Sequence, residues 1–127
     1  MSVSFNPHTG LVLVDAELEG PYGTVALRMA LDTGATRTSI NTGLLLAVGC
    51  DPTFATQHAQ VTTGSGVQLI PLVPIRRLSS LGQHRTGITV LGHTLPPSAN
   101  IDGVLGLDFL RGLELTINFR TGIIDLL

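Results

Sequence analysis

The apolar stretches of this sequence are short, and a glycine or a proline separates most of them from the next. The 127 residues include 15 glycines and 7 prolines, and the apolar runs are rich in Val, Ile, Leu and Thr. Short runs of this kind, with turn residues between them, are typical of strands joined by tight turns. The sequence therefore predicts an all-β fold, and its length fits a single domain over residues 1–127.

Composition narrows the classes of function. Hydrophobic residues make up 43% of the chain and charged residues 13%, which argues against disorder and indicates apolar surface for a partner to cover. The net charge is −2, lysine is absent and the arginines are scattered, so we expect neither a nucleic-acid nor a membrane partner. Cys50 is the only cysteine and the first residues lack a signal sequence, so we expect a cytoplasmic protein without disulfides.

The segment Leu31–Thr36 reads Leu-Asp-Thr-Gly-Ala-Thr, and it follows an apolar run, Thr24–Leu31, that predicts a strand. A strand that stops at Asp-Thr-Gly delivers the carboxylate of Asp32 at a tight turn. Gly34 has no Cβ, so the chain can turn sharply there or admit another backbone closely. An ordinary turn after a strand uses the same residue types, so the tripeptide by itself leaves both interpretations open.

Two later segments matter for the same site. Thr63–Gly66 reads Thr-Gly-Ser-Gly and lies between an alternating run, Gln57–Thr63, and an apolar run, Val67–Leu78, which predicts a hairpin with a glycine-rich tip. Val104–Gly106 predicts a short buried strand, and a short helix is expected directly after it, over Leu107–Arg111.

The sequence also predicts the elements around these segments. We expect an opening antiparallel meander of Val3–Phe5, Leu11–Leu18 and Thr24–Leu31, and then a short helix over Thr42–Gly49 capped by Asn41 or Thr42. A loop is expected over Ser79–Gln83, and a closing hairpin is expected of Leu113–Phe119 and Gly122–Leu127.

In this order and spacing, the segments resemble the retropepsin-like aspartic proteases, single-domain relatives of pepsin that occur in retroviruses and in bacterial and Ddi1-like forms. The resemblance covers nearly the whole chain, and it depends on the pair Leu-Asp-Thr-Gly-Ala and Val-Leu-Gly. The segment Ser39–Gly49 is more similar to the bacterial and cellular members than to the compact viral ones. The resemblance implies a closed, β-barrel-like acid-protease fold with one or two short helices, and aspartic endopeptidase activity without a cofactor or metal.

The resemblance also implies a role for each matching position. Asp32 would be the catalytic carboxylate, and Thr33 would hydrogen-bond across a dimer to hold two active-site loops in register. Gly34 and Ala35 would bring backbone groups close to the carboxylates and the substrate. Val104 would form a wall of a substrate pocket. A flap over the bound peptide would have as its tip Thr63, Gly64, Ser65 and Gly66.

The chain departs from the viral members at two positions. Those proteins usually carry an Asp after the Ala and an Arg after the apolar-apolar-Gly, and the two side chains pair. Thr36 and Leu107 stand at these positions here. Both charges are absent together, so no buried charge is left without a partner.

Only one Asp-Thr-Gly occurs in the chain, whereas the reaction needs two carboxylates that share a proton. We therefore expect a homodimer that cleaves peptides or proteins with one Asp32 from each subunit. A dyad within one chain, formed with Asp102 or Asp108, is the less favoured alternative because neither lies in a second such motif. The alternative functions are a non-catalytic dimerisation or peptide-binding module that keeps the fold, and a processing protease restricted to one partner.

The remaining candidate groups indicate no other chemistry. The four histidines lack metal-ligand spacing, and Ser65 lacks a marked base and orienting group, so we expect neither a metal site nor a serine nucleophile. We expect Asp108 to cap the short helix or to support the active-site loop. Cys50 is expected to be a small buried hydrophobic residue.

Overall fold

The structure is a computed structural model that describes the backbone of residues 1–127 and every side chain except that of Thr63. Strands make up nearly half of the described chain, and its helices are short. The helices are α1 (Thr42–Ala47) and α2 (Leu107–Leu110), with 3₁₀ turns at Pro52–Phe54 and Pro97–Ala99. The strands are β1 (Ser2–Ser4), β2 (Leu13–Gly20), β3 (Gly23–Leu31), β4 (Ser39–Ile40), β5 (Gln57–Thr63), β6 (Gly66–Pro74), β7 (Arg77–Ser80), β8 (Gln83–Thr86), β9 (Thr89–Gly92), β10 (Gly103–Leu105), β11 (Leu115–Asn118) and β12 (Ile123–Leu126).

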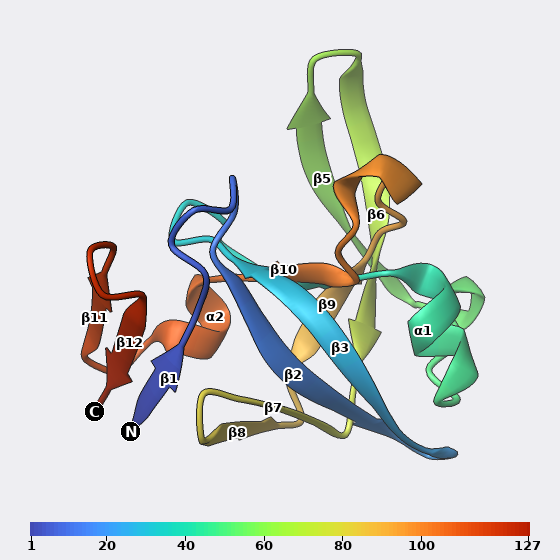
Figure 1. Ribbon diagram of the computed structural model, residues 1–127. Coiled ribbons are helices and arrows are strands. Elements are labelled where there is room, and N and C mark those ends of the chain that lie inside the picture. Colours follow the sequence, from blue (N-terminus) through green and yellow to red (C-terminus); the bar gives the residue numbers. More distant parts are fainter.

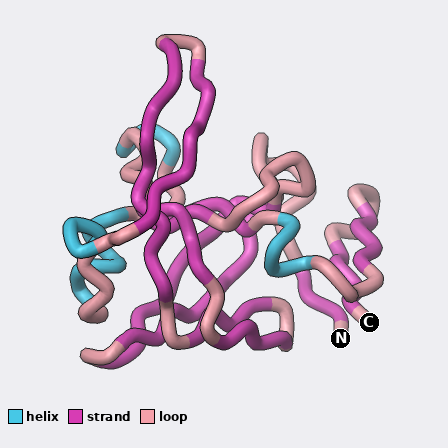
Figure 2. Tube along the Cα trace, turned by 180° about the vertical axis from the view of Figure 1, so that it is seen from behind, coloured by secondary structure: helices cyan, strands magenta, loops and turns pink.

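The described strands form two sheets, which confirms the predicted all-β fold. The larger sheet has nine strands in the order β5-β6-β9-β4-β10-β3-β2-β7-β8, and it curls into half of a barrel (Figure 1). The smaller sheet, β1-β12-β11, lies beside it and brings both chain ends together (Figure 1). The β5–β6 hairpin projects well beyond the body of the molecule (Figure 2). No helix among the described residues is long and apolar enough to cross a bilayer.

The centre of the larger sheet is built around β10, which lies between β3 and β4. The parallel pairing of β10 with β3 places Leu105 opposite Leu31, so both strands end side by side. The antiparallel pairing of β10 with β4 places Gly103 opposite Ile40. The chain therefore leaves β3 on one side of β10, crosses its end in residues 32–38, and returns on the other side.

The hydrophobic core lies directly beneath this crossing. Met29, Ile40, Leu105 and Phe109 are fully buried, and they come from β3, β4, β10 and α2 respectively. Burying a side chain of this size contributes about 1.5–3 kcal/mol each. The crossing segment therefore rests on fully buried side chains of the core.

The predicted opening meander is wrong for its first strand. The β2–β3 hairpin forms as predicted, with Leu13 opposite Ala30, but β1 pairs with β12 instead of β2. Phe5 extends this pairing by donating its N–H to the carbonyl oxygen of Gly122 at 2.8 Å, and its ring meets that of Phe119 edge-on at 5.7 Å. The apolar partners of the first strand thus lie at the far end of the chain.

The loop expected over residues 79–83 is also wrong, because a hairpin occupies it. Leu81 and Gly82 both have positive φ, at 53° and 73°, and form the two-residue turn between β7 and β8. A turn of this kind suits the twist of a tight hairpin. The polar residues around the turn gave no strand pattern in the sequence. In the structure Ser79 and His84 face each other across the hairpin through a 2.7 Å hydrogen bond. The apolar run expected over 67–78 is likewise divided between β6 and β7.

The helix after the crossing begins at one of its two predicted N-caps, Asn41. The Asn41 side chain accepts a hydrogen bond from the Gly43 N–H at the start of α1, and Gly49 ends the segment with φ of 87°. Cys50 follows and is buried, as predicted. Its backbone N–H donates to the carbonyl oxygen of Leu45 at 2.8 Å, which holds the thiol against the core.

The Cys50 thiol should react slowly in the folded protein. Burial raises the pKa of this thiol, and the nearby charge of Arg76 lowers it only in part. A raised pKa reduces the thiolate fraction at pH 8, and the thiolate is the nucleophile. We expect alkylation of the native protein at pH 8 to be at least about tenfold slower than in denaturant. Equal rates in the native and unfolded protein would contradict this placement of the thiol.

Candidate active site

The active-site loop, residues 32–38, begins with a carboxylate fixed by backbone groups. Asp32 donates its N–H to the carbonyl oxygen of Leu105 at 3.0 Å, which ties the start of the loop to the end of β10. Its Oδ1 accepts a hydrogen bond from the Gly34 N–H at 2.8 Å, and its carbonyl oxygen accepts one from Ala35 at 3.2 Å. These bonds form a tight turn and leave the Asp32 side chain exposed to solvent. The geometry presents an oriented carboxylate at the end of a rigid strand.

Gly106 lies where the loop and the end of β10 come closest. A Cβ atom at this position would lie 2.7 Å from the backbone carbon of Arg37 and 2.8 Å from the carbonyl oxygen of Ala35. The neighbouring Leu107 donates its N–H to that same oxygen at 2.8 Å. The Val-Leu-Gly segment therefore supports the active-site loop through backbone contact that only glycine permits.

A second support joins the loop to α2. Thr38 is fully buried, and both its N–H and its hydroxyl donate to the Asp108 carboxylate, at 2.9 Å and 2.7 Å to Oδ1. Asp108 lies in the first turn of α2 and also accepts from the N–H of Phe109, whereas the N-cap residue of the helix is Gly106, which provides no side-chain cap. The Thr38 hydroxyl in turn accepts from the Gly106 N–H at 3.1 Å. The sequence suggested that Asp108 either caps the helix or supports the active-site loop, and the structure shows the support of the loop. The sequence carried no signal for Thr38.

Asp32 opens onto a hollow of about 230 Å³ between the active-site loop and the β5–β6 hairpin. We call it the Asp32 hollow. Its other lining residues are Ala35, Arg37, Ser39, Val61, Ile70, Leu91, His93 and Val104. An adjoining hollow of about 390 Å³ continues along β5 and shares Ala35, Arg37, Val61 and Leu91. Together the two form a groove along the active-site loop and β5.

The predicted site residues divide among three places. Asp32, Ala35 and Val104 line the Asp32 hollow, and Gly34 holds the carboxylate from behind. Thr33 lines a different hollow of about 510 Å³, whose other walls are leucines and the α2 end. The tip residues Gly64, Ser65 and Gly66 form the turn of the projecting hairpin, and they line neither hollow at Asp32. The side chain of Thr63 lies outside the described residues.

Several lining residues were missed in the sequence. Val61 and Ile70 line the hollow from the hairpin strands. Val61 alternates with polar neighbours, which was a usable signal, whereas Ile70 lies in an apolar run that marks no face. Arg37 and His93 come from the active-site loop and the end of β9, and nothing in the local sequence links them. Only the tertiary fold places these two basic residues in the lining of the same hollow as Asp32.

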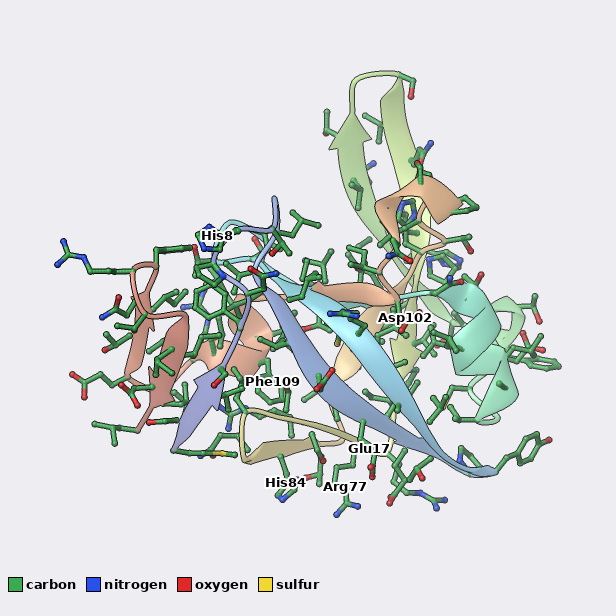
Figure 3. The ribbon with its side chains drawn as sticks, in the orientation of Figure 1. His8, Glu17, Arg77, His84, Asp102 and Phe109 are labelled. Atoms are coloured by element: carbon green, nitrogen blue, oxygen red, sulfur yellow. The ribbon has the colours of Figure 1, made fainter. Side chains whose placement is uncertain are left out.

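Both carboxylates considered for a dyad within the chain are engaged elsewhere. Asp102 lies at the opposite end of β10 from Asp32 and accepts a hydrogen bond from the Arg28 N–H at 2.7 Å (Figure 3). Asp108 is held by Thr38, as above. Neither lines the Asp32 hollow. Among the described residues, no group of three or more His, Cys, Asp and Glu side chains is arranged to bind a metal.

The close approach at Gly106 predicts a specific cost for a methyl group. We expect Gly106→Ala to destabilise the protein by about 1–3 kcal/mol, because the loop backbone must move to relieve the contact. Urea unfolding at one fixed protein concentration measures the change. Gly10→Ala is the matched control, since a Cβ there meets nothing within 4 Å. Equal stability of the two variants would contradict this account of the loop.

Comparison with known proteins agrees with this geometry. A model of the aspartyl protease family matches residues 14–109. No curated protein matches the sequence significantly. Among solved structures, a retropepsin-like aspartic protease from Rickettsia conorii aligns with 99% of this chain and 88% of its own, with a TM-score of 0.74 and 16% identity.

Two further structures show the same fold. The EIAV protease, solved with an inhibitor, aligns with 86% of this chain and 92% of its own, with a TM-score of 0.58 and 19% identity. The retroviral protease-like domain of Ddi1 from Leishmania major aligns with 93% and 89%, with a TM-score of 0.55 and 17% identity. The predicted acid-protease fold is thereby confirmed. The chain belongs to the aspartyl protease family, and its fold is that of a retropepsin-like aspartic protease.

Proposed function

We propose that the protein is an aspartic endopeptidase that works as a homodimer, with one Asp32 from each subunit. The observation that carries the proposal is the incomplete site. Asp32 is exposed, oriented by the Gly34 N–H and placed at the mouth of a hollow, yet no second carboxylate lines that hollow. A second copy of the chain supplies the missing group.

The chemistry requires the pair. One carboxylate, ionised, takes a proton from water as that water attacks the scissile carbonyl carbon. The other, protonated, hydrogen-bonds to the carbonyl oxygen and then provides a proton for the leaving amine. Two carboxylates held close together cannot both ionise, so one retains its proton; this is a general property of aspartic-protease dyads. No cofactor or metal enters these steps.

The apolar hollow beside Thr33 supports a two-fold contact at this place. Its walls include Leu107, Leu110, Leu113 and Leu115, next to the loop that carries Asp32. Apolar surface of this kind is stabilised when a partner covers it. In the smaller sheet β12 is paired on both sides within the chain, while β1 and β11 each keep one free edge. We place the partner on the Thr33 side, where the two loops would meet about a two-fold axis.

The projecting hairpin is the proposed flap. Its strands contribute Val61 and Ile70 to the Asp32 hollow, so the hairpin already forms the upper wall of the groove. A peptide lying in the groove would pass between this wall and the active-site loop. We propose that the tip at 63–66 closes over it.

Mixed subunits test the requirement for two Asp32 residues. Wild-type chains refolded together with an equal amount of Asp32→Asn chains should show about one quarter of the activity of the same total of wild-type protein, since only pairs of wild-type subunits carry both carboxylates. Asp15→Asn chains, altered at an exposed position on β2, should leave the activity unchanged in the same mixture. Activity that falls only to one half would mean that each chain works alone, which contradicts the proposal.

A further inference from the structure

We infer that the Asp32 hollow selects a glutamate side chain of the substrate, next to the scissile bond, through Arg37 and His93. The inference rests on the proposed protease function and names the class of substrate for that same site. It concerns which peptides are bound and cleaved. Arg37 and His93 take no part in the chemical step.

The charges around the hollow carry the inference. Arg37 lines both the Asp32 hollow and the adjoining hollow along β5, so this residue borders the groove where the two meet. The only ion pair among the described residues joins Arg77 to Glu19, on other strands, which leaves Arg37 without a carboxylate partner. His93 reaches the same hollow from the end of β9 and provides an N–H donor in either protonation state. Asp32 is the one acidic residue in the lining.

The remaining walls fit the stem of a glutamate. Val61, Ile70, Leu91 and Val104 are apolar, and they line the same hollow as Asp32 and the two basic residues. A glutamate can place its two methylene groups against such walls while its carboxylate reaches the guanidinium fork. Glutamine has the same shape without the charge, and lysine would meet a like charge. The hollow therefore favours Glu over Gln, and Gln over Lys.

The two-fold axis of the proposed dimer creates the same preference at two positions of the substrate. Each subunit contributes one Asp32 hollow, and the two lie on opposite sides of the paired carboxylates. A bound peptide would therefore place one side chain in each hollow, before and after the scissile bond. Glutamate enrichment is expected at two positions placed symmetrically about the cleavage point.

The cleavage rates of a peptide library test the inference. The library consists of short blocked peptides with each position fixed in turn as Glu, Gln, Leu or Lys. We expect the wild-type dimer to cleave the best Glu pool roughly tenfold or more faster than the matching Gln pool, as a hydrogen-bonded charge pair provides. Arg37→Glu should reverse the order of the Glu and Lys pools, and His93→Gln should reduce the preference in part. Arg120→Glu makes the same charge change at the exposed turn after β11 and should retain the wild-type order.

A binding measurement separates this inference from the protease proposal. Immobilised Asp32→Asn protein should retain more of the Glu pools than of the Gln pools, and Asp32→Asn with Arg37→Glu should lose that difference. Turnover by the wild type with equal rates for Glu and Gln would overturn the inference and leave the protease proposal standing. Absence of turnover would overturn the protease proposal, and the binding result would then decide the inference. Equal binding of Glu and Gln pools would overturn it.

Discussion

Asp32→Asn should reduce peptide cleavage by at least about a thousandfold, the loss expected when an acid–base group of the reaction is removed. The amide cannot accept the proton from the attacking water, and in a symmetric dimer the change removes both carboxylates at once. The fold should be unaffected, because the Asn oxygen can still accept the 2.8 Å hydrogen bond from the Gly34 N–H. Initial rates on a peptide library, with unfolding midpoints measured alongside, check both parts.

The matched control is Asp15→Asn, which makes the same chemical change at an exposed position on β2. This variant should retain wild-type activity. Full activity of the Asp32→Asn protein would show that another group performs the chemistry. If the wild type binds extended peptides but does not cleave them at any pH, the non-catalytic peptide-binding module becomes the better account of the fold.

The active-site loop was predictable because its signals are local. Asp-Thr-Gly after an apolar strand specifies a carboxylate at a turn, and the bonds of Asp32 to Gly34 and Ala35 lie within four residues. The cap of α1 by Asn41 and the hairpin tip at 64–65 are equally local. Elements whose structure depends on near neighbours can be deduced from one sequence.

The parts that escaped prediction depend on contacts between distant segments. The partner of β1 is β12, at the other end of the chain, and no pattern in either strand marks the pair. Thr38 and Asp108 are 70 residues apart, and each alone is an ordinary polar residue near a turn. Arg37 and His93 likewise line one hollow only because β9 and the active-site loop both border it. The sequence alone contains such residues but does not indicate which of them lie close together in the fold.

Asp108→Ala should be the most damaging substitution outside the carboxylate pair. It leaves the Thr38 N–H, in a fully buried residue, without its acceptor, and it removes the acceptor of the Thr38 hydroxyl. The Phe109 N–H keeps the carbonyl oxygen of Gly106 as an acceptor at 3.2 Å. Buried donors left without partners cost about 1–3 kcal/mol each, so we expect a loss of about 3–4 kcal/mol in the free energy of unfolding. Activity should fall about a hundredfold, because the displaced loop misplaces Asp32.

Asp108→Asn isolates the reason for that loss. Asparagine keeps one oxygen that can accept from Thr38, so we expect a cost of about 1 kcal/mol and a partial loss of activity. Urea unfolding at one fixed protein concentration measures both variants, since a dimer's stability depends on concentration. Thr38→Val combined with Asp108→Ala should cost much less than the sum of the two single changes, because both remove the same hydrogen bonds. Additive costs would mean that Thr38 and Asp108 act separately, and the loop would then be held by Gly106 and β10 alone.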